Sequence, residues 1–335
     1  MPVSAYERYG LVSNPFRDLA SENLEDVGIF HVNLAVDDQI GSIEEEVLDK
    51  ENRALVAIVG GPGTGKTQRL LLAAGQGKER KAMVAYVDVT GKSSLLLEDV
   101  TREIQKQAAA AGFAKTFSSP KWYRDLTALQ KIKDGQYDPV AAGKTIGEAL
   151  SGAAPAFLLL NDVHNLSQTP EADVFGKLLQ EISDAIKPGV LVMFCCYTSY
   201  LIWLVKNRPA LASRINRAIS LPRLNAEEAS LLIAKKLLAK RLVENLDPTY
   251  PFDREAVAEL NSRAGGNPRR LLDMADLALE YAAQHRRNRV DSETVRAALL
   301  AGEPASPAGP PVTTAPKPPE ATAASDSLRP APELR

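Results

Sequence analysis

The glycine-rich run from Gly60 to Thr67 constrains the fold of this chain more than any other segment. It has the pattern G-x-x-x-x-G-K-[ST] and lies between a short apolar run, Ala54 to Val59, and a helical pattern that begins at Gln68. A strand, this loop and a helix in succession are the context that the pattern requires. There the glycines let successive backbone N–H groups curl around phosphate oxygens at a helix N-terminus. A chance glycine-rich turn that happens to contain lysine would lack these flanks, so the sequence predicts a phosphate-binding loop.

The side chains of this loop indicate which phosphates it binds. Lys66 would bring a positive charge to the β- and γ-phosphates, and the Thr67 hydroxyl would be a ligand of Mg²⁺. We therefore expect ATP and Mg²⁺ as ligands. The expected nucleotide contacts are Gly60, Gly61, Pro62, Gly63, Thr64, Gly65, Lys66, Thr67 and Gln68.

Further apolar runs predict the strands of one sheet. They span residues 82–89, 156–160 and 190–196, with a shorter final strand at 218–221, and helical patterns such as 95–111 lie between them. Alternating strands and helices are typical of a parallel sheet covered on both faces. The expected fold class is α/β, with a helical region after the sheet.

Changes in pattern along the chain divide it into four parts. After Leu221-Pro222 the sequence becomes wholly helical, and Asn225 with Glu228 forms a plausible capping box. The final segment is rich in Pro and Ala with almost no large apolar residues, so we expect it to be disordered. Between residues 118 and 152 we expect helices and an irregular insertion, to which the sequence assigns no bounds. The predicted parts are a leader packed on the core (1–36), the nucleotide-binding core (37–222), a helical lid (223–300) and the tail (301–335).

A second group of polar residues follows the predicted strand at 156–160. The strand ends in Asn161-Asp162, where a metal ligand and a residue that activates water are expected next to the phosphate loop. Asn161 can accept a hydrogen bond from metal-bound water but brings no charge, so Mg²⁺ should be held less firmly. Asp162 is the general base if Asn161 takes the metal-ligand position. If Asp162 itself takes the metal-ligand position, one residue further along the motif, it is a metal partner. We expect slow hydrolysis, and a surface Asn-Asp turn without a role is the alternative.

Three further sites carry candidate catalytic or nucleotide-binding residues. Thr198, with Ser199 as second choice, follows the strand at 190–196 and would orient water and the γ-phosphate, or simply cap a helix. Arg214 and Arg217 precede the last strand and would act on a neighbouring subunit's ATP, or be solvated helix charges. Arg269, at the start of a lid helix, would contact the nucleotide of its own subunit.

In order and spacing, five stretches of this chain resemble AAA+ ATPases of the general secretion pathway A type and the ATP-binding regulators of bacterial transposition, and more distantly the Orc/Cdc6-like group. The resemblance implies an αβα sandwich with a helical lid, ATP-dependent oligomers, and a switch that acts on a partner protein or DNA. Asn161, in place of an acidic residue, departs from the family pattern. The stretches are Tyr9-Gly-Leu with Asn14-Pro-Phe16, the phosphate loop, residues 159–166, residues 214–228, and Gly265-Gly-Asn-Pro-Arg-Arg270.

Composition leaves several function classes open and excludes others. No apolar run approaches the ~20 residues of a membrane span, and residues 1–10 do not resemble a signal peptide, so we expect a cytoplasmic protein. The formal charge of −2 requires no nucleic-acid partner. DNA contact would depend on a local run, His285 to Arg289 with Arg263, Arg269 and Arg270, whose alternative role is to stabilise a helix C-terminus.

Two alternatives to an ATP-switched assembly factor follow from the same residues. Asn161 motivates a nucleotide-dependent scaffold that does not hydrolyse ATP. A metabolic kinase would also carry a phosphate loop, but the helical segment after the core and the Gly-Asn-Pro-Arg turn argue against it.

Overall fold

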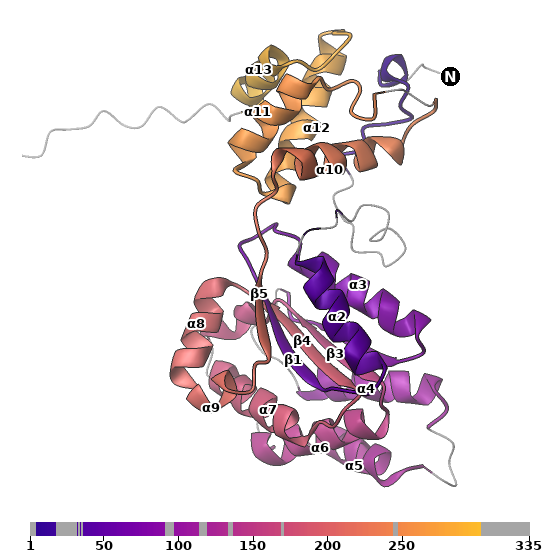
Figure 1. Ribbon diagram of the computed structural model, residues 1–335, viewed down its shortest axis with the longest axis vertical. Coiled ribbons are helices and arrows are strands. Elements are labelled where there is room, and N and C mark those ends of the chain that lie inside the picture. Colours follow the sequence, from indigo (N-terminus) through magenta and orange to yellow (C-terminus); the bar gives the residue numbers. More distant parts are fainter. Residues whose placement is uncertain are drawn as a thin grey trace, which may run out of the picture.

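Five apolar segments form a single parallel sheet with the order β2-β3-β4-β1-β5 (Figure 1). The strands are β1 (Ala54–Val59), β2 (Met83–Asp88), β3 (Ala156–Asn161), β4 (Val190–Cys196) and β5 (Arg217–Ser220). β1, β3 and β4 are buried along their whole length, as expected for strands covered on both faces. The predicted strands and their parallel arrangement are confirmed, with ends that differ by one residue.

The computed structural model describes residues 5–17, 32, 34, 36–90, 97–113, 119–132, 137–168, 171–243 and 247–302. The tail predicted to be disordered, from residue 303 onward, lies outside the described residues. Among the helices that are described, none is both long enough and apolar enough to span a bilayer.

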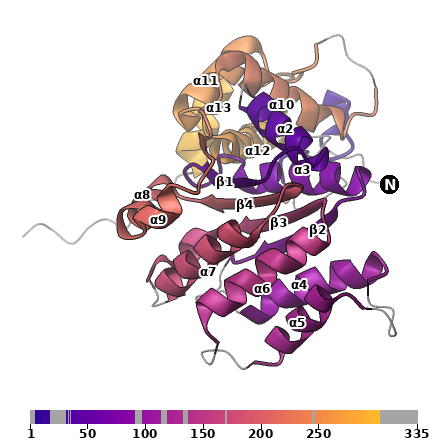
Figure 2. The same cartoon turned by 60° about the horizontal axis from the view of Figure 1, so that its bottom comes forward.

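Helices cover the two faces of the sheet unequally, as Figure 2 shows. On one face lie α2 (Asp37–Leu48) and α3 (Lys66–Glu79), whose apolar side chains meet Val56 and Ile58. The other face carries the larger core. The helices that contribute to it are α4 (Leu97–Ala110), α5 (Lys121–Gln130), α6 (Pro139–Gly152), α7 (Glu171–Ala185), α8 (Thr198–Asn207) and α9 (Pro209–Ala212).

The segment expected to hold helices, without assigned bounds, contains α5 and α6. The start of α6 follows from local chemistry, because Asp138 accepts hydrogen bonds from the N–H groups of Val140 and Ala141, and Pro139 occupies the first turn.

The lid is a second helical cluster built from α10 (Ala226–Leu238), α11 (Arg254–Ala264), α12 (Pro268–Gln284) and α13 (Ser292–Gly302). α10 begins with the predicted capping box, since Asn225 and Glu228 each bond the other's backbone N–H. Its core is separate from the two sheet cores.

The N-terminal leader does not lie where we expected it. Tyr9, Leu11 and Phe16 are buried in the lid cluster, and the ring of Phe16 packs edge-on against Phe252. The prediction that the leader packs on the nucleotide-binding core is therefore wrong for these residues. The apolar anchors were recognised from sequence, but their partners are lid residues more than 200 positions away in the chain.

Candidate functional site

The phosphate loop connects β1 to α3 at the carboxyl edge of the sheet. Gly63 and Gly65 adopt left-handed backbone angles (φ 72° and 91°), which glycine adopts without steric cost. Thr64 Oγ1 donates to the Gly61 carbonyl at 2.9 Å and tightens the turn. The loop borders a cleft of about 210 Å³ between the sheet and the lid.

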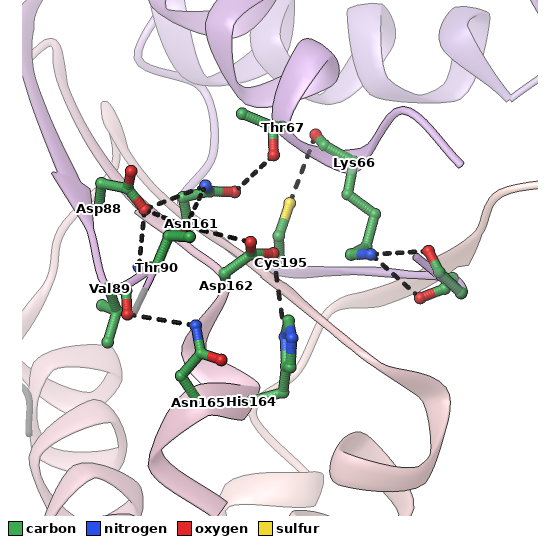
Figure 3. Close-up of polar contacts among 12 residues, drawn as sticks. Lys66, Thr67, Asp88, Val89, Thr90, Asn161, Asp162, His164, Asn165 and Cys195 are labelled. Atoms are coloured by element: carbon green, nitrogen blue, oxygen red, sulfur yellow. Dashed lines mark hydrogen bonds and ion pairs between the residues drawn. The ribbon is translucent and has the colours of Figure 1, made fainter. Parts of the chain in front are cut away.

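Lys66 is buried beneath the loop (Figure 3). Its Nζ donates to the carbonyls of Gly60 and Gly61 at 3.2 and 2.9 Å, and lies 4.9 Å from the centre of the Tyr197 ring. Burial lowers the pKa of Lys66, and the carboxylate of Asp162 opposes that effect. The loop carbonyls and the ring thus hold the ammonium group where it also lines the cleft.

Thr67 and Asn161 meet directly. The Thr67 hydroxyl donates to Asn161 Oδ1 at 3.0 Å, and Asn161 Nδ2 donates to Asp88 Oδ1 at 3.2 Å. Asn161 is the last residue of β3 and Asp88 the last of β2, and the two are paired in the sheet register. The structure therefore brings two of the three predicted metal ligands, Thr67 and Asn161, into contact and adds an acidic residue that we did not predict.

Asp162 lines the cleft beside Lys66 and Thr67. Its backbone is left-handed (φ 54°), a conformation that aspartate tolerates better than most residues. Thr90 Oγ1 lies within hydrogen-bonding distance of Asp162 Oδ2, at 3.1 Å, and His164 Nδ1 is 3.9 Å from Asp162 Oδ1. The carboxylate is thus held at the edge of the cleft, where it can act on water or a metal.

His164 packs against the Tyr197 ring with the ring centres 3.5 Å apart and the ring planes tilted by 31°. Burial lowers the pKa of His164, and the nearby charge of Asp162 acts in the opposite direction. The imidazole supports the ring over which Lys66 lies. Neither His164 nor Tyr197 was recognised from sequence, since each follows its strand without a distinctive spacing.

The donors at this edge suit Mg²⁺. The Thr67 hydroxyl, the Asn161 amide oxygen and the Asp162 carboxylate are hard oxygen ligands, which Mg²⁺ prefers. Within the described residues, no group of three or more His, Cys, Asp or Glu side chains could hold a metal ion alone. Magnesium sites that depend on one or two side chains together with substrate phosphates have this composition.

The lid closes the cleft from the other side. Asn267 Nδ2 donates to the Pro62 carbonyl at 2.7 Å, and the backbone N–H of Arg269 donates to the Gly63 carbonyl at 3.3 Å. Arg269 lines the cleft, where we expected it. The apolar part of the cleft, suited to a nucleobase, is formed by Val32, Leu34, Leu224, Leu232 and Leu272.

A buried ion pair fixes one wall of this apolar part. The Arg69 guanidinium bonds both carboxylate oxygens of Asp37 at 3.1 Å and reaches the Val32 carbonyl at 3.5 Å. Both residues were missed from sequence, because Arg69 is one of several cations near the loop and its partner lies 32 positions before it.

Other predicted residues lie outside the cleft. Thr198 and Ser199 are exposed in the first turn of α8, and Tyr197 lines the cleft in their place. Arg214 forms an ion pair with Asp184 on α7, with Nη2 and Oδ2 2.7 Å apart. Arg217 is exposed at the amino end of β5, away from the phosphate loop. The predicted roles of these residues remain predictions.

The same arrangement of sheet and lid occurs in solved structures. Aeropyrum pernix Orc1 in complex with DNA aligns at a TM-score of 0.52 and 17% identity, over 81% of this chain and 66% of Orc1. Cdc6p from Pyrobaculum aerophilum aligns at 0.54 and 15%, over 82% and 71%. Aeropyrum pernix Orc2, solved with ADPNP and ADP, aligns at 0.55 and 14%, over 83% and 72%.

The chain has the AAA+ fold. At these identities the comparison establishes the fold alone, and the chain spans about two thirds of the length of Orc1. No protein-family model and no curated protein sequence matches it. The phosphate loop, Arg269 and the apolar wall border one cleft between the sheet and the lid.

Proposed function

We propose that this chain is an ATP-binding AAA+ switch that hydrolyses ATP slowly and assembles with further copies of itself to engage a partner protein. The observation that carries the proposal is the direct contact between lid and phosphate loop, through Asn267 with Pro62 and Arg269 with Gly63. Phosphates bound by the loop would lie beside Arg269, so the γ-phosphate would bias the position of the lid. A lid that responds to the γ-phosphate is a suitable element for controlling assembly.

Slow hydrolysis follows from the two residues at the end of β3. The Asn161 amide offers an oxygen but no charge, and Asp162 is shorter than the glutamate usual for a general base. The hydrogen bond from Thr67 to Asn161 supports a role for the amide at the metal. Lys66 would bind the β- and γ-phosphates, and a bound Mg²⁺ would neutralise charge on them.

Nucleotide binding and sizing measurements test this proposal. The wild-type chain should bind a fluorescent ATP analogue, whereas Lys66→Ala should lose most of that affinity. A slowly hydrolysed ATP analogue should increase the mass measured by light scattering, and ADP should not. Absence of nucleotide binding, or a mass independent of nucleotide, would contradict the proposal.

The alternative is a scaffold that binds ATP without hydrolysing it. The placement of Asp162 at the cleft, oriented by Thr90, favours hydrolysis. Turnover that is measurable in the wild type and lost in Asp162→Ala, with binding retained, would exclude the scaffold. No turnover in either protein would favour it.

DNA contact is a further candidate, since the Orc1 structure contains DNA. Of the basic residues considered, Arg263 pairs with Glu259 at 2.8 Å and Arg287 lies 3.6 Å from Glu293. These pairs support the structural role of the cations. ATP-stimulated binding that weakens steeply with salt would favour DNA as a partner. The resemblance to secretion and transposition ATPases rests on the sequence motifs.

A further inference from the structure

We propose that Asp88 is the acidic residue of this metal site, a positioning residue that orients the Asn161 amide and supplies the charge that Asn161 lacks. This inference rests on the proposed binding of ATP and Mg²⁺. It extends the site to β2, which contributes none of the residues predicted from sequence for metal or nucleotide.

The sheet register places Asp88 beside Asn161. They form the last pair of the β2–β3 ladder, at the same edge as the phosphate loop. Register partners on parallel strands point to the same face of the sheet. In consequence their side chains meet, with Nδ2 of Asn161 3.2 Å from Oδ1 of Asp88.

This contact, together with a longer one from the same Nδ2 to Thr90 Oγ1 at 3.4 Å, orients the amide toward the metal site. An ionised carboxylate only accepts hydrogen bonds, so it selects the NH₂ group of Asn161. The amide oxygen is thereby turned to Thr67, whose hydroxyl donates to it at 3.0 Å. Figure 3 shows Asn161 lying between Asp88 and Thr67. Without Asp88, the amide could rotate and present a donor to the metal site.

Asp88 is itself held in place by the turn that follows β2. Its Oδ1 accepts from the N–H of Thr90 at 2.9 Å and is 2.6 Å from the Thr90 hydroxyl. The same hydroxyl lies 3.1 Å from Asp162 Oδ2. Thr90 therefore connects Asp88, at the end of β2, to Asp162, the residue that follows Asn161.

The pairing also accounts for the amide at position 161. An aspartate there would face Asp88 at hydrogen-bonding distance with like charges, which is unfavourable. An amide fits between a carboxylate on one side and a hydroxyl on the other. The negative charge that is usual at the end of β3 is thus carried by Asp88 at the end of β2, one strand further from Thr67.

The test compares nucleotide affinity in excess Mg²⁺ with affinity in EDTA, using a fluorescent, slowly hydrolysed ATP analogue. Asp88→Asn should reduce the Mg²⁺-dependent gain in affinity about tenfold or more, the usual effect of removing a residue that orients a metal ligand. Its affinity in EDTA should stay at the wild-type value. The double variant Asp88→Asn/Asn161→Asp reverses the pair and should recover the Mg²⁺ response.

Controls separate this role from a structural one. Asp49→Asn removes an exposed aspartate at the C-terminal end of α2, which does not line the cleft. This variant should leave the nucleotide affinity unchanged both in Mg²⁺ and in EDTA. If Asp88→Asn unfolds, Asp88→Ser removes the charge while its hydroxyl can still cap the turn at Thr90.

Two outcomes overturn the inference while leaving the proposed function intact. One is an Asp88→Asn protein with the wild-type Mg²⁺ response, and the other is a double variant that recovers nothing. A wild-type chain that binds no nucleotide in either buffer contradicts the proposed function and removes the premise of this inference.

Discussion

The side chain of Asn267 bonds both the lid and the phosphate loop. Its Oδ1 accepts from the backbone N–H of Arg270 at 3.1 Å and so caps α12, and its Nδ2 donates to the Pro62 carbonyl at 2.7 Å. The single amide of Asn267 thus caps the N-terminus of α12 and holds this helix against the phosphate loop. A change in the loop on phosphate binding therefore acts directly on the first turn of α12.

Replacing Asn267 separates these two roles. Asn267→Ser keeps a cap but is too short to reach Pro62, so nucleotide affinity should fall about fivefold, the equivalent of one hydrogen bond of about 1 kcal/mol. Its free energy of unfolding should stay close to wild type. Asn267→Ala also loses the cap, which should cost about 1 kcal/mol more in stability. Titration with a fluorescent nucleotide and urea unfolding measure the two effects. Equal affinity in Asn267→Ser and the wild type would show that the loop contact has no role in binding.

Gly63 lies where the loop meets the lid closely. A β-carbon there would lie 2.6 Å from Arg269 Cβ and 3.0 Å from Asn267 Oδ1, and the backbone is left-handed. Gly63→Ala should therefore displace the lid and weaken nucleotide binding by about tenfold or more, which corresponds to ~1.4 kcal/mol.

The matched control is Gly41→Ala. Gly41 lies inside α2, and a β-carbon there would meet nothing within 4 Å. Alanine should leave binding unchanged and raise helix stability by up to about 1 kcal/mol. The same nucleotide titration checks both variants, and wild-type affinity in Gly63→Ala would contradict the tight contact.

Glu44 makes stability depend on pH. Its side chain is buried on α2, and its Oε1 has no hydrogen-bond partner among the residues that the structure describes. Burial, with the charges of Asp37 and Glu45, raises the pKa of Glu44 from 4.5 to about 8. The folded chain therefore holds this proton more tightly than the unfolded chain. The contribution of Glu44 to the free energy of unfolding decreases as pH rises from about 4.5 to about 8, and is constant above that.

Glu44→Gln should remove this dependence. At pH 8 the variant should be more stable than wild type by on the order of a few kcal/mol, and the difference should shrink toward pH 5. Urea unfolding across this range measures it, with the exposed Glu51→Gln as control. A difference that does not vary with pH would argue against a protonated Glu44.

The parts of this structure that could be predicted depend on local pattern. The phosphate loop has its glycines and Lys66 at fixed spacing, and the apolar runs of β1, β3 and β4 are buried whichever strands lie next to them. Asn225 was placed at a helix start because its capping box depends on Glu228, only three positions away.

The parts that were missed depend on contacts between distant segments. Asp88 has a role only because β2 pairs with β3 in a register that sets it opposite Asn161. The ion pair between Arg69 and Asp37 likewise joins two helices, and the partners of the leader lie in the lid. A single sequence shows the residue types but not these pairings.

The structure distinguishes the two arginines that were proposed to act on a neighbouring subunit. Arg214 is engaged by Asp184 through two nitrogens, whereas the exposed Arg217 bonds only the carbonyl of Asn216 among the contacts that the described chain provides. An arginine already paired must give up that partner to reach a phosphate, so Arg217 is the better candidate for action in trans. We expect Arg217→Ala to reduce turnover and nucleotide-dependent assembly, as measured by phosphate release and light scattering, while nucleotide affinity of the monomer is retained. Arg214→Ala should instead lower stability by up to about 1 kcal/mol and leave assembly unchanged. The reverse pattern would assign the role in trans to Arg214.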